Sequence, residues 1–226
     1  MHLRSQPVFP RLIAICLVAA ALSPATLHAQ EGGVRTARQG DSVSYFIAPG
    51  APGSGYRSED RQLALWALGA WQRAAGGALH FVPADEANAL VRIYWVPAGG
   101  GEYGETQLLR VGGRLGAAVY VRPDTEGLGA DIAGRARNDP LFRDTVVYLT
   151  CLHELGHALG LQHTTDFDDV MYFFGFGGDI PRFFERYREQ LHTRDDIAKV
   201  SGLSAGDLAQ LRALEGRAIS YQRGQK

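Results

Sequence analysis

The chain contains little cysteine, which limits what can hold its fold together. Of 226 residues only two are cysteine, Cys16 and Cys151. Cys16 lies in an N-terminal stretch that we expect to be removed, so the mature chain would keep one cysteine and form no intramolecular disulfide. We expect Cys151 to be a small buried residue rather than a ligand. Stability must then come from a packed core, and residues 30–226 are enough for one domain.

An excess of one charge and long apolar runs are also missing. The chain has 23 basic and 24 acidic residues, a net charge of −1. This balance gives no support for a nucleic-acid partner or an anionic membrane surface. The apolar run 12–22 is too short to span a bilayer and follows two arginines. Residues 1–29 therefore have the pattern of a secretory signal peptide, cleaved after Ala29 or Ala25. We expect a secreted protein, extracellular or periplasmic, without a membrane anchor.

The most specific pattern is the eleven-residue stretch HELGHALGLQH that begins at His153. On a helix, residues four apart lie on one face, so His153 and His157 can present two imidazoles to one ion. Gly160 tolerates the left-handed conformation in which helices end, so the chain can turn and bring His163 to the metal. Three protein ligands with an open fourth position are typical of a catalytic zinc. Glu154 is offset from the ligand face, where it can hold a zinc-bound water.

This stretch resembles the zinc signature of the metzincin metalloproteases. That family carries a methionine turn beneath the metal, and Met171, eight residues beyond the third histidine, fits it. The short spacing, Thr164 and the Met-Tyr pair are most similar to the matrixin branch, although Phe173 stands where matrixins usually carry proline. The resemblance implies one catalytic Zn²⁺ ion and three ligands: His153, His157 and His163. The chain has no recognisable counterpart of the second structural zinc or of the calcium loops of many matrixins.

The activity implied by this resemblance is that of a zinc endopeptidase acting on protein or peptide substrates. Zinc polarises the scissile carbonyl and lowers the pKa of its bound water towards about 7. Glu154 would take the proton of that water as general base and pass it to the leaving amine. Two other hypotheses stay open: a zinc-binding scaffold without turnover, which has no use for Glu154, and a toxin-like protease with one cellular target. We expect a monomer.

The fold implied by the resemblance is the α+β fold of a metzincin catalytic domain. It comprises a twisted mixed β-sheet with a backing helix, a central zinc-binding helix, the Met-turn and a helical C-terminal subdomain. Runs of strand-forming residues predict five strands: 43–47, 79–82, 90–96, 107–111 and 115–121. The backing helix should start at an N-cap, Ser58, and the zinc helix at Asp139-Pro140. We expect residues 127–134 to form a loop.

After the Met-turn, helical spacing and capping residues predict three further helices. The first carries apolar residues on one face: Phe183, Phe184, Tyr187 and Leu191. The other two would begin at capping pairs: Thr193 with Asp196, and Ser204 with Asp207. Asp207 also matches an acidic position of the matrixin C-terminal helix.

A substrate strand is expected along the sheet. By resemblance, residues 116–120 would form the edge strand above the cleft, with three residues at its centre: Ala117, Ala118 and Val119. A substrate would add to it as an extra strand through backbone hydrogen bonds. The alternative is an ordinary hairpin at the margin of the sheet.

The chain after the Met-turn is the candidate wall of a substrate pocket. In the matrixin pattern this segment contacts the substrate residue that follows the scissile bond, and here it contains Tyr172, Phe173 and Phe174. The alternative is that these rings pack on Phe183 and Tyr187 as a small separate core. Near them, three acidic residues could orient a ligand imidazole or form a solvated turn: Asp166, Asp168 and Asp169.

Overall fold

The computed structural model describes residues 42–99 and 102–223, and only the backbone of residues 215–223. The expected signal peptide, residues 1–29, lies outside the described residues. Among the helices that are described, none combines the length and the apolar character needed to cross a membrane.

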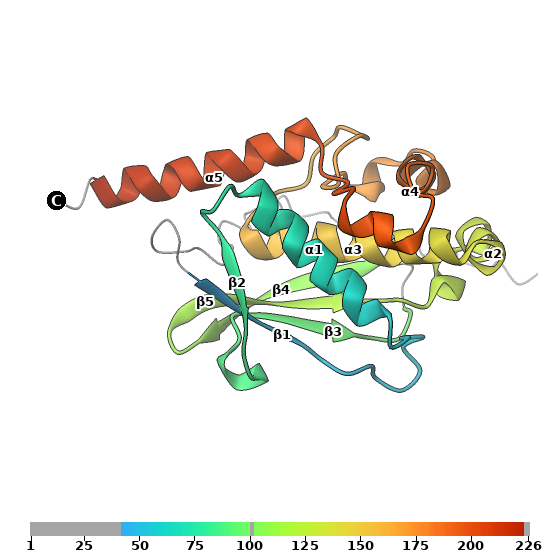
Figure 1. Cartoon of the computed structure of the whole chain (residues 1–226), viewed down its shortest axis with the longest axis horizontal. Coiled ribbons are helices and arrows are strands. Elements are labelled where there is room, and N and C mark those ends of the chain that lie inside the picture. Colours follow the sequence, from blue (N-terminus) through green and yellow to red (C-terminus); the bar gives the residue numbers. More distant parts are fainter. Residues whose placement is uncertain (1–41, 100–101, 224–226) are drawn as a thin grey trace, which may run out of the picture.

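Five strands form one mixed sheet in the order β2-β1-β3-β5-β4 (Figure 1). Their bounds are β1 Ser42–Ile47, β2 His80–Pro83, β3 Val91–Trp95, β4 Gly104–Val111 and β5 Arg114–Val121. All neighbouring strands run parallel except β4, which pairs antiparallel with β5. Along β3 the residues Val91, Ile93 and Trp95 are buried, while those between them are partly exposed. This alternation gives the sheet one core-facing side, and it confirms the α+β prediction.

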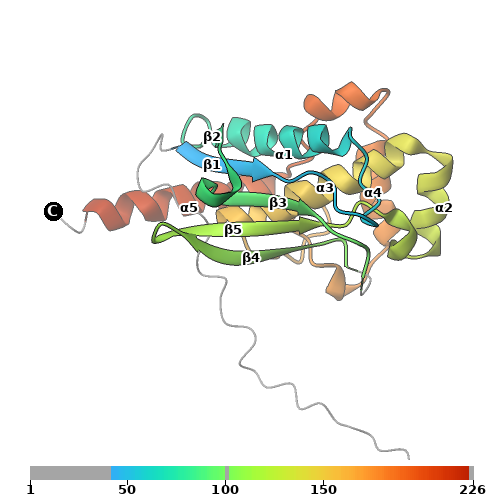
Figure 2. The same cartoon turned by 90° about the horizontal axis from the view of Figure 1, so that it is seen from below.

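Helices α1 (Asp60–Ala74) and α3 (Pro140–Leu159) pack together on that side of the sheet (Figures 1 and 2). The indole N–H of Trp71 in α1 donates to the carbonyl oxygen of Leu152 in α3 at 2.9 Å. Both the tryptophan and α3 are therefore buried at the centre of the domain, as expected for a helix whose flank is apolar.

The ends of α3 follow the sequence prediction. The Asp139 carboxylate accepts from the backbone N–H groups of Leu141 and Phe142 at 3.0 and 3.1 Å, and Pro140 occupies the first helical turn. Gly160 ends the helix with a φ of 101°. These two signals fix where the zinc helix begins and where the chain can reverse.

Two local predictions were wrong. Ser58 is not an N-cap, because its hydroxyl donates to the Glu59 carboxylate and the helix begins at Asp60, whose buried carboxylate pairs with Arg143 of α3. Residues 127–134 are not a loop. A 3-10 turn, Thr125–Leu128, leads there into α2, Ala130–Asn138, which buries Ile132, Ala133 and Ala136 on one face.

The predicted edge strand must also be corrected. β5 lies between β3 and β4, so Ala117, Ala118 and Val119 are inside the sheet, and β4 is its last strand. The reason is burial on both faces: the three residues are at most 5% exposed, whereas β4 is polar and only partly covered. A polar strand is suited to an edge, and an apolar strand is not.

The C-terminal part begins with α4 (Ile180–Arg188) and a 3-10 turn (Arg194–Ala198), both of which pack against α3. It ends with α5 (Ala205–Arg223), which extends beyond the sheet (Figure 1). Further 3-10 turns span Glu86–Asn88 and Phe174–Phe176. Both predicted capping pairs are present, although the pair at Thr193 opens a 3-10 turn rather than an α-helix.

Candidate active site

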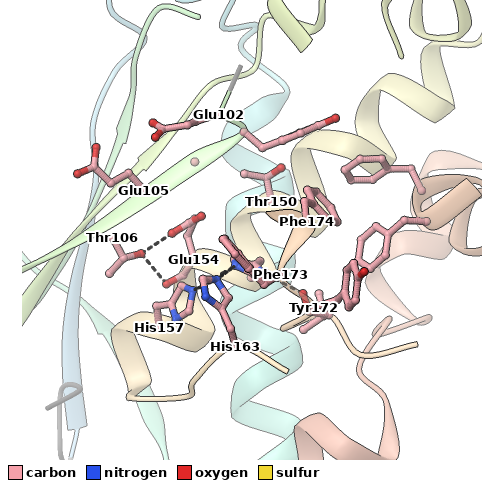
Figure 3. Close-up of a pocket in the computed structure, with 16 residues that line it drawn as sticks. Glu102, Glu105, Thr106, Thr150, Glu154, His157, His163, Tyr172, Phe173 and Phe174 are labelled. Atoms are coloured by element: carbon pink, nitrogen blue, oxygen red, sulfur yellow. Dashed lines mark hydrogen bonds between the residues drawn. The ribbon is translucent and has the colours of Figure 1, made fainter. Parts of the chain in front are cut away.

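Three histidines converge at one point beside the sheet. His153 and His157 project from the same face of α3, and the chain reverses after Gly160. This reversal brings His163 next to His157 (Figure 3). The Nε2 atoms of His153 and His157 are 3.1 Å apart, and that of His163 lies 3.3 and 3.0 Å from them. The three predicted ligands are thus brought together.

The hydrogen bonds of the two helical histidines determine which ring nitrogen faces this point. The Nδ1 atom of His153 donates to the Val170 carbonyl at 2.7 Å, and that of His157 donates to the Leu161 carbonyl at 3.0 Å. A carbonyl can only accept, so in the neutral rings the proton is on Nδ1 and the Nε2 lone pairs face each other. Such lone pairs repel unless a cation lies between them.

The spacing fits zinc in particular. Two ligands about 2.0–2.1 Å from a tetrahedral zinc are about 3.3 Å apart, close to the three Nε2 separations. Burial lowers the pKa of all three histidines, to about 4 for His163, so the rings are neutral in the form that coordinates metal.

The acidic cluster after His163 has other partners. Asp168 pairs with Arg186 and Asp169 accepts from the Ser204 hydroxyl, while backbone carbonyls orient the two helical histidines. Of the two interpretations considered for this cluster, orientation of a ligand imidazole is therefore wrong for His153 and His157.

Glu154 follows His153 on α3, but its side chain points towards β4 (Figure 3). Its exposed fraction is 6%, and the Thr106 hydroxyl donates to its Oε2 at 2.7 Å. Burial raises the pKa of Glu154, and the hydrogen bond from Thr106 partly opposes this shift. Sequence reasoning missed Thr106, because no signal in β4 pairs it with a residue 48 positions away.

The Met-turn lies directly beneath the histidines. Met171 is fully buried, and a Cβ at Gly156 would lie 2.4 Å from its Sδ, so the turn can approach α3 because that residue is glycine. The Asp207 carboxylate accepts from the N–H groups of Val170 and Met171 at 2.9 and 3.2 Å. The start of α5 thus holds the turn that orients His153.

The departure from the matrixin pattern at Phe173 has a structural counterpart. Its backbone N–H donates to the Thr164 carbonyl at 3.3 Å, while the N–H of Thr164 donates to the Met171 carbonyl at 2.9 Å. Proline has no N–H and could not make the first bond. The chain after the third histidine therefore pairs with the chain leaving the Met-turn.

A cleft of about 410 Å³ opens beside the histidines and continues into an aromatic pocket. Its lining includes the three predicted aromatic residues and two more from α4: Tyr172, Phe173, Phe174, Phe183 and Phe184. Phe174 packs on Phe183 with ring centroids 4.9 Å apart, whereas Phe173 is 42% exposed and lies 4.7 Å from the His163 ring. The two alternatives for these rings, a separate aromatic core and a pocket wall, therefore describe the same cluster. Tyr187 is not part of that cluster, because it stacks on Tyr148.

Two histidines of a long central helix converge with a third from the chain that follows it, next to a mixed sheet and a buried methionine. These features are those of a metzincin catalytic domain, the class of zinc metalloendopeptidases to which the fold and the site correspond. Within this class, the profile of the matrixin family matches residues 37–200, and the chain belongs to that family. Its catalytic ion is accordingly zinc, and its substrates are proteins or peptides. A search of curated proteins found no match.

Proposed function

We propose that this matrixin is a secreted endopeptidase in which Glu154 is the general base. The observation that carries this role is the place of Glu154: its carboxylate lines the same cleft as the histidines and makes its hydrogen bond to β4, not to a histidine. Bound zinc would supply Lewis-acid polarisation of the scissile carbonyl and of a water molecule. Three histidines would hold the ion through Nε2: His153, His157 and His163.

The protein groups have distinct tasks in this proposal. The buried Glu154 carboxylate takes a proton at one of its oxygens and passes it to the leaving amine. In the protein without its metal, burial raises the pKa of Glu154, so this carboxylate holds a proton more tightly than an exposed glutamate does. Met171 packs beneath the histidines and takes no part in proton transfer.

Substrate would bind along β4 and in the aromatic pocket. Because β4 is the last strand of the sheet, its outer backbone groups can pair with an extended peptide, a contact that tolerates many side chains. The aromatic lining favours a large apolar residue immediately after the scissile bond. A scaffold without turnover has no use for this combination of base, edge strand and pocket.

The test of the general base combines metal analysis with proteolysis. Glu154→Ala should keep about one zinc ion per chain and lose about 10²- to 10⁴-fold in peptide cleavage, the usual contribution of a general base. Glu189→Ala, which removes an exposed carboxylate paired with Arg182, is the matched control and should cleave like the wild type. Wild-type cleavage by Glu154→Ala would refute the role of Glu154. A zinc-loaded wild type that cleaves no peptide would favour the scaffold.

Secretion is proposed from the signal-peptide pattern of residues 1–29. When the full chain is expressed with an export system, N-terminal sequencing of the exported protein should start at Gln30 or at Thr26. A protein that stays inside the cell with its N-terminus intact would contradict this part of the proposal.

A further inference from the structure

The inner face of β4, which is the face directed at α3, contacts the Glu154 carboxylate. Side chains alternate along a strand, and the hydrogen bond between Glu105 and Gln107 places these two residues on the same face. Gly104 and Thr106 therefore share the opposite face, which is directed at α3. Glu154 approaches Gly104 closely and accepts a hydrogen bond from Thr106, which Figure 3 shows.

Each of the two residues constrains a different carboxylate oxygen. The Thr106 hydroxyl lies 2.7 Å from Oε2 and 2.9 Å from the Glu154 backbone carbonyl. A hydroxyl has one hydrogen, and a bond to a charged acceptor is the stronger one, so the carboxylate receives it. On the other side, a Cβ at Gly104 would lie 2.8 Å from Oε1 and 2.7 Å from Cγ. The lack of a side chain at this position is what leaves room for the carboxylate.

We propose that Thr106 is a positioning residue of the peptidase, which fixes the rotamer of Glu154 through its hydroxyl while Gly104 leaves room for the carboxylate. This inference rests on the proposed role of Glu154 as general base. The strand β4 would then have two functions. Its outer backbone groups would bind the substrate, and its inner face would orient the Glu154 carboxylate. A base held in one orientation contributes to the chemical step more than to substrate affinity.

The first test compares Thr106→Val with Thr106→Ser. Valine has nearly the shape of threonine but no hydroxyl, so kcat should fall about ten- to a hundredfold while KM changes by less than about threefold. Serine keeps the hydroxyl and should restore kcat to within about threefold of the wild type. A wild-type kcat in Thr106→Val, a change in KM alone, or a Thr106→Ser variant as slow as Thr106→Val would overturn the inference.

Thr145→Val is the matched control. Thr145 is fully buried in α3, and its hydroxyl has no hydrogen-bond partner among the described residues. The same chemical change there removes no hydrogen bond, so kcat should stay at the wild-type value. A comparable fall of kcat in this variant would show that the substitution acts through general repacking, and the inference would fail.

The second test uses neither zinc nor activity. Urea unfolding of the metal-free protein is measured for the wild type, Thr106→Val, Glu154→Ala and the double variant. If the hydroxyl bonds the carboxylate, Thr106→Val should lower the midpoint in the wild type and have less than half that effect in the Glu154→Ala background. Equal shifts of the midpoint in both backgrounds would mean that the Thr106 hydroxyl donates to the Glu154 backbone carbonyl, and would overturn the inference. Failure of the general-base proposal would appear instead as cleavage by Glu154→Ala.

Discussion

Replacing Gly156 with alanine should have two opposite effects on the stability of the protein, one from helix propensity and one from packing. Gly156 lies between His153 and His157, in the interior of α3. Helix propensity alone favours alanine over glycine there by about 1 kcal/mol. The tertiary structure predicts the opposite sign, because a Cβ at this position would lie 2.4 Å from Met171 Sδ and 3.1 Å from Trp71 Cζ2.

The size of the overlap decides which effect is larger. Non-bonded heavy atoms prefer separations of about 3.5–4.0 Å, so the sulfur would have to move by about 1 Å. Met171 and Trp71 are both fully buried, and the backbone of Met171 is held by Asp207. Overpacking of this kind costs about 1–3 kcal/mol, and we expect the upper end of that range. After the gain in propensity, the free energy of unfolding should fall by about 2 kcal/mol.

Urea unfolding of the metal-free protein measures this change, with Gly134→Ala as the control. Gly134 is also in a helix interior, in α2, but a Cβ there would meet nothing within 4 Å, so this variant should gain about 0.5–1 kcal/mol. Displacing the Met-turn should also weaken zinc binding, since the Val170 carbonyl orients His153. A Gly156→Ala variant as stable as the wild type would refute the steric argument.

Three further predictions concern the groups around the site. Asp207→Asn should lower the free energy of unfolding by about 2–3 kcal/mol. Both carboxylate oxygens of Asp207 accept hydrogen bonds from backbone N–H groups, whereas the asparagine amide has only one oxygen that can accept them. An unchanged urea midpoint would contradict this prediction. In the metal-free protein, burial lowers the pKa of His163 from 6.5 to about 4, so the unfolded chain binds more protons. This contribution to stability should be complete above pH 6.5 and be lost as the pH falls to 4, and a flat profile in urea unfolding would argue against it. In cleavage mapping of a peptide library, leucine should be preferred to alanine after the scissile bond by about ten- to a hundredfold, and Phe174→Ala should weaken this more than Phe173→Ala, whose ring is 42% exposed. Cuts dominated by charged or small residues at that position would remove the pocket assignment.

Much of the metal site could be predicted from the sequence because its determinants are local. The spacing of His153 and His157 is set by the helical repeat, and the ends of α3 by Asp139 and Gly160, whose effects act within one turn. The Ser204–Asp207 pair is equally local and is present as a reciprocal cap. Such patterns depend on the backbone geometry of a few consecutive residues, so they can be recognised without knowledge of the rest of the fold.

Strand order was decided only by the tertiary structure. Hydrophobic periodicity tells which residues are buried but not which strand lies next to which, and the assignment by family resemblance placed the edge on the wrong strand. The apolar β5 pairs with β3 as well as with β4, and the more polar β4 is left at the margin of the sheet. The same lack of long-range information hid α2, whose glycines indicated a loop although three of its apolar residues are buried.

The surroundings of the predicted site residues were likewise beyond the sequence. Thr106 and Glu154 are 48 positions apart, and Val170 and His153 are 17 apart. Each contact forms because a segment distant in the sequence, β4 or the Met-turn, packs closely against α3. This close approach depends on small residues at the contact, such as Gly104 and Gly156. A local pattern can therefore name the candidate ligands and the proposed base, whereas the atoms that orient their side chains depend on how distant segments pack together.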